Sequence, residues 1–449
     1  MPAISLSNNK HGPDRGTSIH DKSIYNSKGH INGSLYHEHE SQSTNLIGNV
    51  LREKIQSIDL DTCLSGGEDS FFVADLGVVY RQHVRWIKNL PRIEPFYAVK
   101  CNGDPQVLNL LVKLGLSFDC ASKNEISSIL DLGVDPSRII YANPVKTPSY
   151  LGYARQQGVG MMTFDNSDEL LKCKKFYPDA QLLLRIMTDD STATCQLSVK
   201  FGAPMSDTKK LLALAKELNL NVVGVAFHVG SGASDPTVYA EAVENSRQVF
   251  DEALELGFPP LSILDVGGGF EDDCFEIAAE VLNNSLAEHF PDDSVRVIAE
   301  PGRYYVATAF TLATSVIGRR WVDEQKGKAM IYVNDGVYGN LNSILFDHQN
   351  PVPRPLTSGE SFLYNGKDEI PFHHRDHHSS NYEFSVWGPT CDGLDCISKS
   401  VLFPVSIDVG DWLYFNDVGA YTLAASTTFN GFNLDCKVHY VCSSPEVDL

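Results

Sequence analysis

Polar residues that could do chemistry recur along this chain, each placed directly after a short apolar run. Lys100 closes the run FYAVK, His228 follows VGVAF, and Glu300 follows RVIA. A lysine in a partly buried pocket loses its charge easily, and its amine then attacks carbonyl groups. Alone, Lys100 has a structural explanation too, because lysines at strand ends often extend their amines to solvent. Taken together, however, the polar residues and glycines at the ends of successive apolar runs indicate a functional site. They are Lys100, Asp119, Asn143, Asp165, Arg185, His228, Gly267–Gly269 and Glu300.

Glycines at the last three positions of this set indicate a phosphate site. HVGSG contains Ser231, ILDV runs into three glycines at 267–269, and EPGR contains Arg303. Glycine turns expose backbone N–H groups that can surround a phosphate, and a guanidinium pairs with phosphate oxygens. One glycine turn would be a weak signal, because any tight turn favours glycine. Three in succession form a much stronger signal.

A phosphate site and a lysine amine together match the requirements of pyridoxal 5'-phosphate. This cofactor is held by a bond from lysine to its aldehyde and by contacts to its phosphate. It also needs a carboxylate beside its pyridine nitrogen, and Glu300 is placed to provide one. An ion pair from Glu300 to Arg303 is the alternative explanation, and the two functions are compatible. We therefore predict pyridoxal phosphate as the cofactor.

No metal is expected. The stretch PFHHRDHHSSNYE (371–383) holds four histidines that could bind a metal at helical spacing, but its polar, proline-flanked composition favours an exposed loop. These histidines are His373, His374, His377 and His378. The ten cysteines are irregularly spaced, and no second pair accompanies Cys391 and Cys396 at the spacing of a structural zinc site.

Eight apolar runs rich in β-formers alternate with helical patterns, which predicts a parallel sheet. They are FYAVK (96–100), FDCAS (118–122), IIYAN (139–143), MTFDN (162–166), LLLRI (182–186), VGVAFHV (223–229), SILDVGG (262–268) and RVIAEP (296–301). Helix-start residues lie between runs, as where Ser122 precedes Glu125 by three. A count of eight favours a closed (β/α)8 TIM-type barrel over an open doubly wound sheet. Such a barrel collects its strand ends at one mouth.

The length of 449 residues predicts two domains of an α/β protein. Residues 1–45 are rich in Ser, Asn, His and Gly, which predicts a disordered tail. Residues 46–75 are expected to lend a strand to the second domain, and residues 76–306 to form the barrel. Residues 307–449 carry alternating, turn-bounded runs that predict a C-terminal antiparallel β domain, which bears the loop GPTCDG (388–393).

The composition of the chain excludes some classes of binding partner and indicates a compartment. A net charge of −21 opposes binding to nucleic acid and mildly favours a small cationic substrate. No apolar stretch of about 18 residues is present, so no membrane contact is expected. The N-terminus lacks the apolar core of a secretory signal, and the ten cysteines are typical of reduced thiols. We expect a cytoplasmic protein.

The motifs together resemble those of the eukaryotic ornithine decarboxylases, which are fold type III pyridoxal-phosphate-dependent decarboxylases. The resemblance covers about residues 70–440 and includes FYAVKCN, FDCASKNEI, AFHVGSG, LDVGGGF, AEPGRYYVA, FDHQ and WGPTCDGLDCI. FDHQ and GLDCI are similar to fungal members. The resemblance implies decarboxylation of L-ornithine to putrescine and carbon dioxide, the first step of polyamine synthesis.

The resemblance also implies a function for each site residue. Lys100 would bind the cofactor's aldehyde, and Cys391 would protonate the substrate's Cα after carbon dioxide leaves. Asp347, next to Phe346, and Asp392 would hold the distal ammonium group of ornithine. The cofactor would further contact Asp119, Arg185, His228, Ser231, Gly268, Gly269, Glu300, Pro301, Gly302, Arg303 and Tyr421.

Cys391 could otherwise be half of a disulfide, a metal ligand or a buried thiol. The flanking Gly-Pro-Thr and Gly indicate an exposed loop, and a thiol beside Asp392 can serve as an acid. The resemblance implies a homodimer in which this loop enters the partner's barrel, with the protein antizyme as a further partner. Two alternatives stay open. One is a lysine/ornithine decarboxylase, since Phe346 stands where some relatives have tyrosine. The other is a non-catalytic antizyme-binding homologue, against which Lys100 and Cys391 argue.

Overall fold

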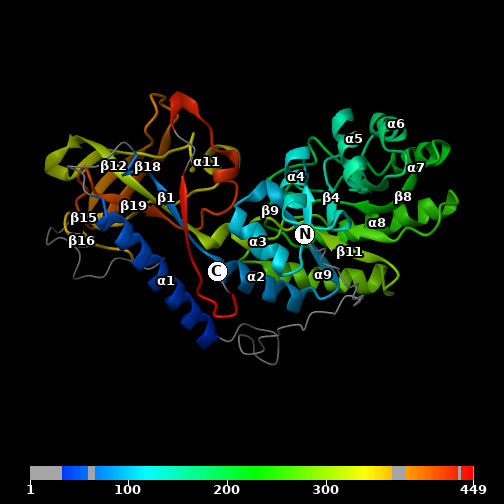
Figure 1. The fold of residues 1–449 in the computed structure, drawn as a ribbon, viewed down its shortest axis with the longest axis horizontal. Helices are drawn as coiled ribbons and strands as arrows, with labels where there is room; N and C mark the ends of the chain where they lie inside the picture. The colour runs from blue at the N-terminus through cyan, green and yellow to red at the C-terminus, as the bar shows by residue number, and fades with distance from the viewer. Residues whose placement is uncertain (1–32, 59–65, 367–380, 433–435, 448–449) are drawn as a thin grey trace, which may run out of the picture.

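The computed structural model describes residues 33–58, 66–366, 381–432 and 436–447, which form a barrel beside a second domain (Figure 1). Eight parallel strands close the barrel: β2 (Ile93–Ala98), β3 (Ser117–Cys120), β4 (Ile139–Tyr141), β5 (Met161–Phe164), β6 (Gln181–Arg185), β8 (Asn221–Ala226), β10 (Ile263–Asp265) and β11 (Arg296–Ala299). Each of the eight apolar runs supplies one of these strands, so the predicted (β/α)8 barrel is confirmed. The histidine-rich stretch 373–378 lies outside the described residues.

Helices surround the barrel and pack their apolar faces against it. They are α2 (Leu76–Asn89), α3 (Pro105–Lys113), α4 (Lys123–Asp131), α5 (Pro148–Gln157), α6 (Ser167–Phe176), α7 (Thr208–Glu217), α8 (Val238–Glu255) and α9 (Phe275–His289). Ser122 Oγ accepts from the Glu125 N–H at 3.3 Å, and the Glu125 carboxylate accepts from the Ala121 N–H at 2.6 Å. The first bond satisfies an N–H group that the first helical turn leaves free, and the second ties the residue before the N-cap to the helix, so α4 begins where the sequence predicts.

The second domain is a mixed sheet, whereas the sequence predicts an antiparallel one. Its strands are β1 (Phe71–Asp75), β12 (Phe310–Asp323), β13 (Lys328–Val333), β14 (Arg354–Pro355), β17 (Tyr382–Trp387), β18 (Cys396–Phe403), β19 (Trp412–Phe415) and β20 (Lys437–Val441). Most pairs are antiparallel, but β13 pairs with β17 and β1 pairs with β20 in parallel. Parallel neighbours need a long connection. About fifty residues separate β13 from β17, and the whole barrel separates β1 from β20.

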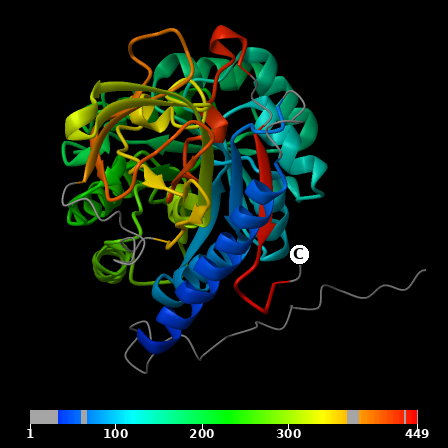
Figure 2. The ribbon, with the colours of Figure 1, turned by 90° about the vertical axis from the view of Figure 1, so that its left-hand side faces the viewer.

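The predicted tail of residues 1–45 extends too far, because helix α1 spans Gly33–Gln56. Ile47 and Leu51 on this helix are buried against Phe71, Val73 and Trp412 of the β domain. Figure 2 views the molecule from this side, with α1 in the foreground. The first turns of α1 lie in polar sequence, where no pattern of apolar residues predicts a helix. The strand expected within residues 46–75 is β1.

Asp75 joins the two domains where β1 runs into α2. Its Oδ1 accepts from the backbone N–H groups of Gly77 and Ser443, both at 2.9 Å. Its Oδ2 accepts from the hydroxyls of Ser43 at 2.6 Å and Ser443 at 2.5 Å. One buried carboxylate thus caps α2 and ties α1 and the chain's C-terminal segment to the barrel. Among the described helices, none combines the length and apolar character needed to cross a membrane.

Candidate active site

The barrel interior explains how the strands aim their polar residues. It is filled by a cluster of apolar side chains: Phe96, Ile140, Met161, Leu183, Ala226, Ile263 and Ile298. Successive side chains on a strand point to opposite faces, so a residue two positions later points inward again. Two positions beyond the last four of these stand Arg185, His228, Asp265 and Glu300. The apolar interior therefore ends in a polar mouth.

Lys100 and Asp119 form an ion pair in this mouth. Lys100 lies in a short turn after β2 (η1, Val99–Cys101), and its Nζ donates a hydrogen bond to Asp119 Oδ2. Asp119 is fully buried, whereas the Lys100 side chain keeps 38% of its surface exposed. Burial would lower the pKa of Lys100, but Asp119 and Glu300 outweigh burial and raise that pKa above its ordinary value. The ammonium form of Lys100 is therefore the stable one beside these carboxylates.

Arg303 gathers the groups expected to bind phosphate. It begins the short helix α10 (Arg303–Val306), and its Nε and Nη2 donate to Ser231 Oγ at 3.1 and 2.8 Å. Its Nη2 also donates to Asp347 Oδ1 at 2.7 Å, and Nε lies 3.1 Å from Glu271 Oε1. The guanidinium carbon lies 5.2 Å from the centre of the Tyr421 ring. The structure thus brings Ser231, Arg303 and Tyr421 together.

The glycines at 267–269 allow backbone to approach backbone. Gly267 has φ +65°, and a Cβ there would lie 2.1 Å from the Phe227 carbonyl oxygen. At Gly268, a Cβ would lie 2.8 Å from the Glu300 carbonyl oxygen. Gly269 has φ +99°, a conformation that side chains disfavour. The turn therefore requires glycine. The Gly267 N–H donates to Asp265 Oδ1, so the N–H groups of Gly268 and Gly269 are the ones that could contact a phosphate.

His228 is neutral. The Gly230 N–H donates to its Nδ1 at 3.0 Å, so Nδ1 carries no proton. Burial holds the pKa of His228 well below its usual value, and the cations Arg185 and Lys100 lower it further. An uncharged imidazole at this position can pack flat against an aromatic ring.

Asp265 and Glu300 form a buried acidic pair, and the sequence analysis did not select Asp265. Asp265 is fully buried, and Glu300 keeps 8% of its surface exposed. Burial raises the pKa of Asp265 to about 7, although a hydrogen bond from Glu300 and one from the Gly267 N–H oppose this rise. Burial and the neighbouring carboxylates hold the pKa of Glu300 well above its usual value. Counting two residues beyond Ile263 would have found Asp265.

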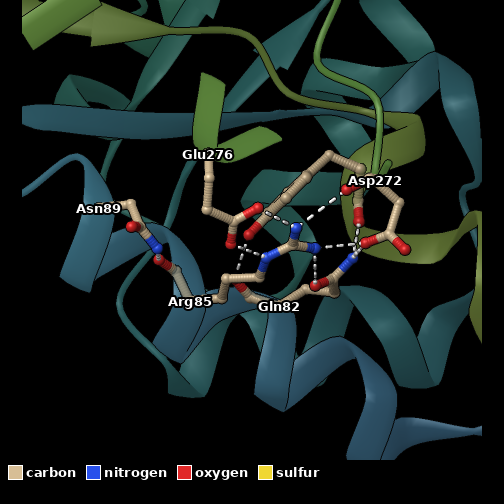
Figure 3. A network of polar contacts seen from close by, with 6 residues as sticks. Gln82, Arg85, Asn89, Asp272 and Glu276 are labelled. Carbon is tan, nitrogen blue, oxygen red and sulfur yellow. Dashed lines mark hydrogen bonds and ion pairs between the residues drawn. The ribbon is translucent and has the colours of Figure 1, made fainter. Parts of the chain in front are cut away.

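A second layer holds the segment that follows the glycine turn (Figure 3). Arg85 on α2 donates to both carboxylate oxygens of Glu276, from Nε at 2.7 Å and from Nη2 at 2.6 Å. Arg85 also contacts the Asp272 side chain, to which Gln82 Nε2 donates at 2.7 Å. Paired contacts of a buried guanidinium fix orientation as well as distance. Glu271, the neighbour of Asp272, is thereby held beside the phosphate-site arginine.

Comparison with known proteins identifies the family. Residues 76–307 match the family described as "Pyridoxal-dependent decarboxylase, pyridoxal binding domain". The ornithine decarboxylase of Neurospora crassa is 52% identical over 96% of this chain and 91% of its own length. This chain belongs to the pyridoxal-dependent decarboxylases. Antizyme inhibitor 2 of Xenopus laevis is 47% identical over 88% of this decarboxylase and 85% of its own length.

A solved structure has the same fold. The arginine decarboxylase of Paramecium bursaria Chlorella virus, bound to agmatine, superposes with a TM-score of 0.78 at 35% identity. The match covers 89% of this decarboxylase and 100% of the viral chain. The predicted pairing of a barrel with a β domain is therefore shared with this viral enzyme.

The residues of the mouth fit the family's cofactor, pyridoxal phosphate. Asp119 Oδ1 is buried and lacks a hydrogen-bond partner among the described residues. A buried acceptor of this kind fits a polar group on a bound ring. The glycine turn, Ser231 and Arg303 offer donors suited to a phosphate, and Lys100 offers its amine at the same mouth. The cofactor prediction is confirmed.

The two residues expected at the substrate's far end lie in different surroundings. Asp347 follows the short helix α11 (Ser343–Phe346) and is 5% exposed, with its carboxylate on Arg303 and 3.5 Å from Cys195 Sγ. Phe346 beside it is 62% exposed. Asp392 lies on the β domain, where it accepts a hydrogen bond from the Tyr338 hydroxyl. The described contacts of Asp392 do not reach Lys100.

Cys391 is also separate from the barrel residues of its own chain. It is exposed in the loop after β17, and its N–H donates to Asn430 Oδ1 at 3.0 Å. The buried Asp395 shapes this loop by accepting from the N–H of Val337 at 2.9 Å and from the N–H and hydroxyl of Thr390 at 3.0 and 2.7 Å. The loop thus has a defined shape and presents its thiol outward.

Sequence reasoning also missed two residues that contact the phosphate site. Glu271 and Cys195 reach Arg303 and Asp347, but neither stands at the end of a barrel strand. Cys195 ends the short strand β7 (Ala193–Cys195), which pairs with β9 (Ser231–Ala233) so that Cys195 opposes Ser231. This pairing joins residues 36 positions apart, and no local pattern in the sequence announces it.

Proposed function

We propose that this decarboxylase converts L-ornithine to putrescine and carbon dioxide. Support comes from the ornithine decarboxylase that is 52% identical over nearly the whole chain. The observation that carries the proposal is the mouth itself, where Lys100 is paired with a buried carboxylate on a barrel that also holds Arg303 and Ser231. An amine beside a phosphate site is the minimum that pyridoxal-phosphate chemistry needs.

Each side chain of the mouth has a function in this proposal. Bound pyridoxal phosphate supplies an electron-withdrawing ring that takes up the electron pair left at Cα when carbon dioxide departs. Lys100 would bind the aldehyde carbon, and Asp119 Oδ2, which accepts a hydrogen bond from Nζ, could take the proton that Nζ must first lose. Glu300 would pair with the ring nitrogen, and His228 would pack on the ring face. The remaining contacts come from Arg185, Ser231, Gly268, Gly269, Pro301, Gly302, Arg303 and Tyr421.

Selection of ornithine rests on the charge at its far end. Asp347 and Asp392 are assigned to the distal ammonium, with Phe346 as a neighbouring wall. A site built to pair with a charged group rejects an analogue that lacks it, because the analogue displaces water from the carboxylates without pairing with their charge. Asp347 already contacts Arg303, so it can meet an ammonium with one oxygen while the other keeps the guanidinium.

Completion of the site requires a second copy of the chain. Cys391, assigned to protonate Cα, and Asp392 lie on an outward loop of the β domain. In a homodimer this loop enters the partner's mouth. Large exposed apolar side chains next to site residues support an interface there: Phe346 is 62% exposed and Leu394 is 65% exposed.

Two observations support a cellular compartment and a protein partner for the enzyme. The nine cysteines among the described residues are all free thiols, which supports a reducing compartment and hence the cytoplasm. The likeness to antizyme inhibitor 2 supports antizyme as a protein partner. A purely non-catalytic function is disfavoured, since Lys100 and Cys391 are both present.

Product analysis tests the proposal. The purified protein is supplied with pyridoxal phosphate and either ornithine or lysine, and the diamines formed are quantified. We expect putrescine from ornithine, little cadaverine from lysine, and neither product from Lys100→Ala. Cadaverine formed as fast as putrescine would instead support the lysine/ornithine alternative. An inactive wild-type protein that still binds the cofactor would contradict the proposed reaction.

A further inference from the structure

Asp265 and Glu300 form a buried acidic pair, and the number of protons that the two carboxyl groups hold follows from their surroundings. Asp265 Oδ1 accepts from the Gly267 N–H at 2.9 Å, whereas Asp265 Oδ2 is buried and receives a hydrogen bond from no donor among the described residues. Glu300 follows β11, the strand that pairs with β10, and its carboxyl group neighbours that of Asp265 in the mouth. Two ionised carboxylates can only accept hydrogen bonds and repel each other, so their burial side by side favours a proton on one of them. The pair therefore holds at least one proton.

The charges that face the pair lead to the same count. Asp119, on β3, adds a third carboxylate. Arg185, at the end of β6, and Lys100, after β2, add two cations. His228, after β8, is neutral. Three carboxylates and two cations leave one negative charge in a buried mouth, and one shared proton removes it. Buried charge is stable only when compensated in this way.

A ring nitrogen that carries a proton changes where the shared proton can sit. Glu300 must then be the anion that accepts the ring N–H. If Asp265 were also an anion, two buried carboxylates would face each other with nothing between them. We propose that the pair keeps one proton, which moves from Glu300 to Asp265 Oδ2 when the ring N–H reaches Glu300. Asp265 is thus a positioning residue that acts through Glu300, an assignment that rests on the proposed function of Glu300.

The proposal predicts how cofactor affinity depends on pH. Because burial raises the pKa of Asp265 to about 7, the pair holds a second proton below that pH. When the cofactor arrives with its ring nitrogen already protonated, that proton must leave before Glu300 can accept the ring N–H. Affinity for pyridoxal phosphate should therefore fall as the pH drops below about 7, by up to about tenfold per pH unit. Above pH 7 this contribution should disappear.

Asp265→Asn separates this proton from the fold. The asparagine Oδ1 can still accept from the Gly267 N–H, and its Nδ2 donates to Glu300 at every pH. The dissociation constant of pyridoxal phosphate is measured for both proteins from pH 6 to 8. Dividing the wild-type value by that of the variant cancels the titrations of the cofactor itself. We expect this ratio to increase about tenfold for each unit by which the pH falls below 7, and to be constant above pH 7. A ratio independent of pH would overturn the proposal.

Two further variants exclude a general effect of losing buried polar groups. Asp411 is a 5%-exposed carboxylate of the β domain that accepts from the Gly359 N–H at 2.9 Å, and Asp411→Asn should keep the wild-type pH dependence. Asp265→Leu removes the donor to Glu300, so it should weaken cofactor binding at every pH, while Asp265→Asn does not. Equal weakening by both substitutions would show a packing function only. Ornithine turnover, assayed separately, tests the proposed reaction independently of this result.

Discussion

At the scale of single residues, Lys100 is held as a cation and His228 as a neutral ring, although burial disfavours the charged form of both. Burial lowers the pKa of both Lys100 and His228. Lys100 touches Asp119, so its charge is retained. Burial holds the pKa of His228 well below its usual value, and the cations Arg185 and Lys100 lower it further, so its charge is lost. The neighbours rather than the residue type decide the outcome. The mouth thus holds the Lys100 ammonium paired with a carboxylate, and a neutral His228 imidazole that can pack against an aromatic ring.

Cys391→Ala should separate cofactor binding from catalysis. The thiol is exposed and donates to nothing in the mouth of its own chain, so the variant should bind pyridoxal phosphate normally. Loss of a positioned acid should slow putrescine formation by roughly 10²- to 10⁴-fold. Mass spectrometry of the products should also show protonation at the wrong carbon. The measurements are the cofactor's dissociation constant, the rate of putrescine release and the product masses.

Cys442→Ala is the matched control for this prediction. Cys442 is half-buried near the end of the chain, and its Sγ lies 3.1 Å from the Ser444 carbonyl oxygen. It should keep wild-type turnover and wild-type products. Putrescine formed by Cys391→Ala at the wild-type rate would remove Cys391 from the reaction.

Most of the site could be predicted because its residues follow strand ends, where a local pattern marks them. Glycine turns and an apolar run before each polar residue lead to Lys100, His228 and Glu300. Asp265 was missed because it lies inside the motif LDVGGG, where the glycines attract attention and the strand's inward side must be counted. Charge states were not predictable, since they depend on neighbours from five different strands.

At the scale of elements, helix α1 is attached to the β domain by few side chains. Leu51 is fully buried against β1 and β19, so Leu51→Ala should leave a cavity and lower the free energy of unfolding by about 2–5 kcal/mol. Leu254 on α8 is 58% exposed, and Leu254→Ala should change it by no more than about 0.5 kcal/mol. Urea unfolding measures both. Equal effects would show that α1 adds nothing to the domain.

The elements that sequence analysis missed depend on distant partners. The barrel strands and their helices repeat a local alternation, so their number and order were predictable. The parallel pairing of β1 with β20 joins Phe71 to Lys437, 366 positions away, and nothing near either strand indicates its direction. The start of α1 lies in polar sequence, and only its later turns show an apolar face. Long-range pairing and polar helix ends are what local periodicity cannot supply.

At the scale of the whole molecule, the chain keeps its amine and its thiol on different domains. Lys100 lies in the barrel mouth, whereas Cys391 lies on an outward loop held by Asn430 and shaped by Asp395. A loop with internal hydrogen bonds resists folding back into its own barrel, because it would lose them. A second chain can approach without such a loss. A symmetric dimer would then form two identical mixed sites.

Mixing two inactive variants tests this arrangement. In a dimer of Lys100→Ala with Cys391→Ala, one site carries both substitutions and the other carries neither. Random exchange of subunits should therefore restore about one quarter of wild-type activity, measured as putrescine formed after co-incubation. Lys100→Ala mixed with Lys100→Met is the control, since every site then lacks the amine and no activity should return. Activity no greater than that of the separate variants would mean that each chain completes its own site, and the loop of Cys391 would then have to refold to reach Lys100.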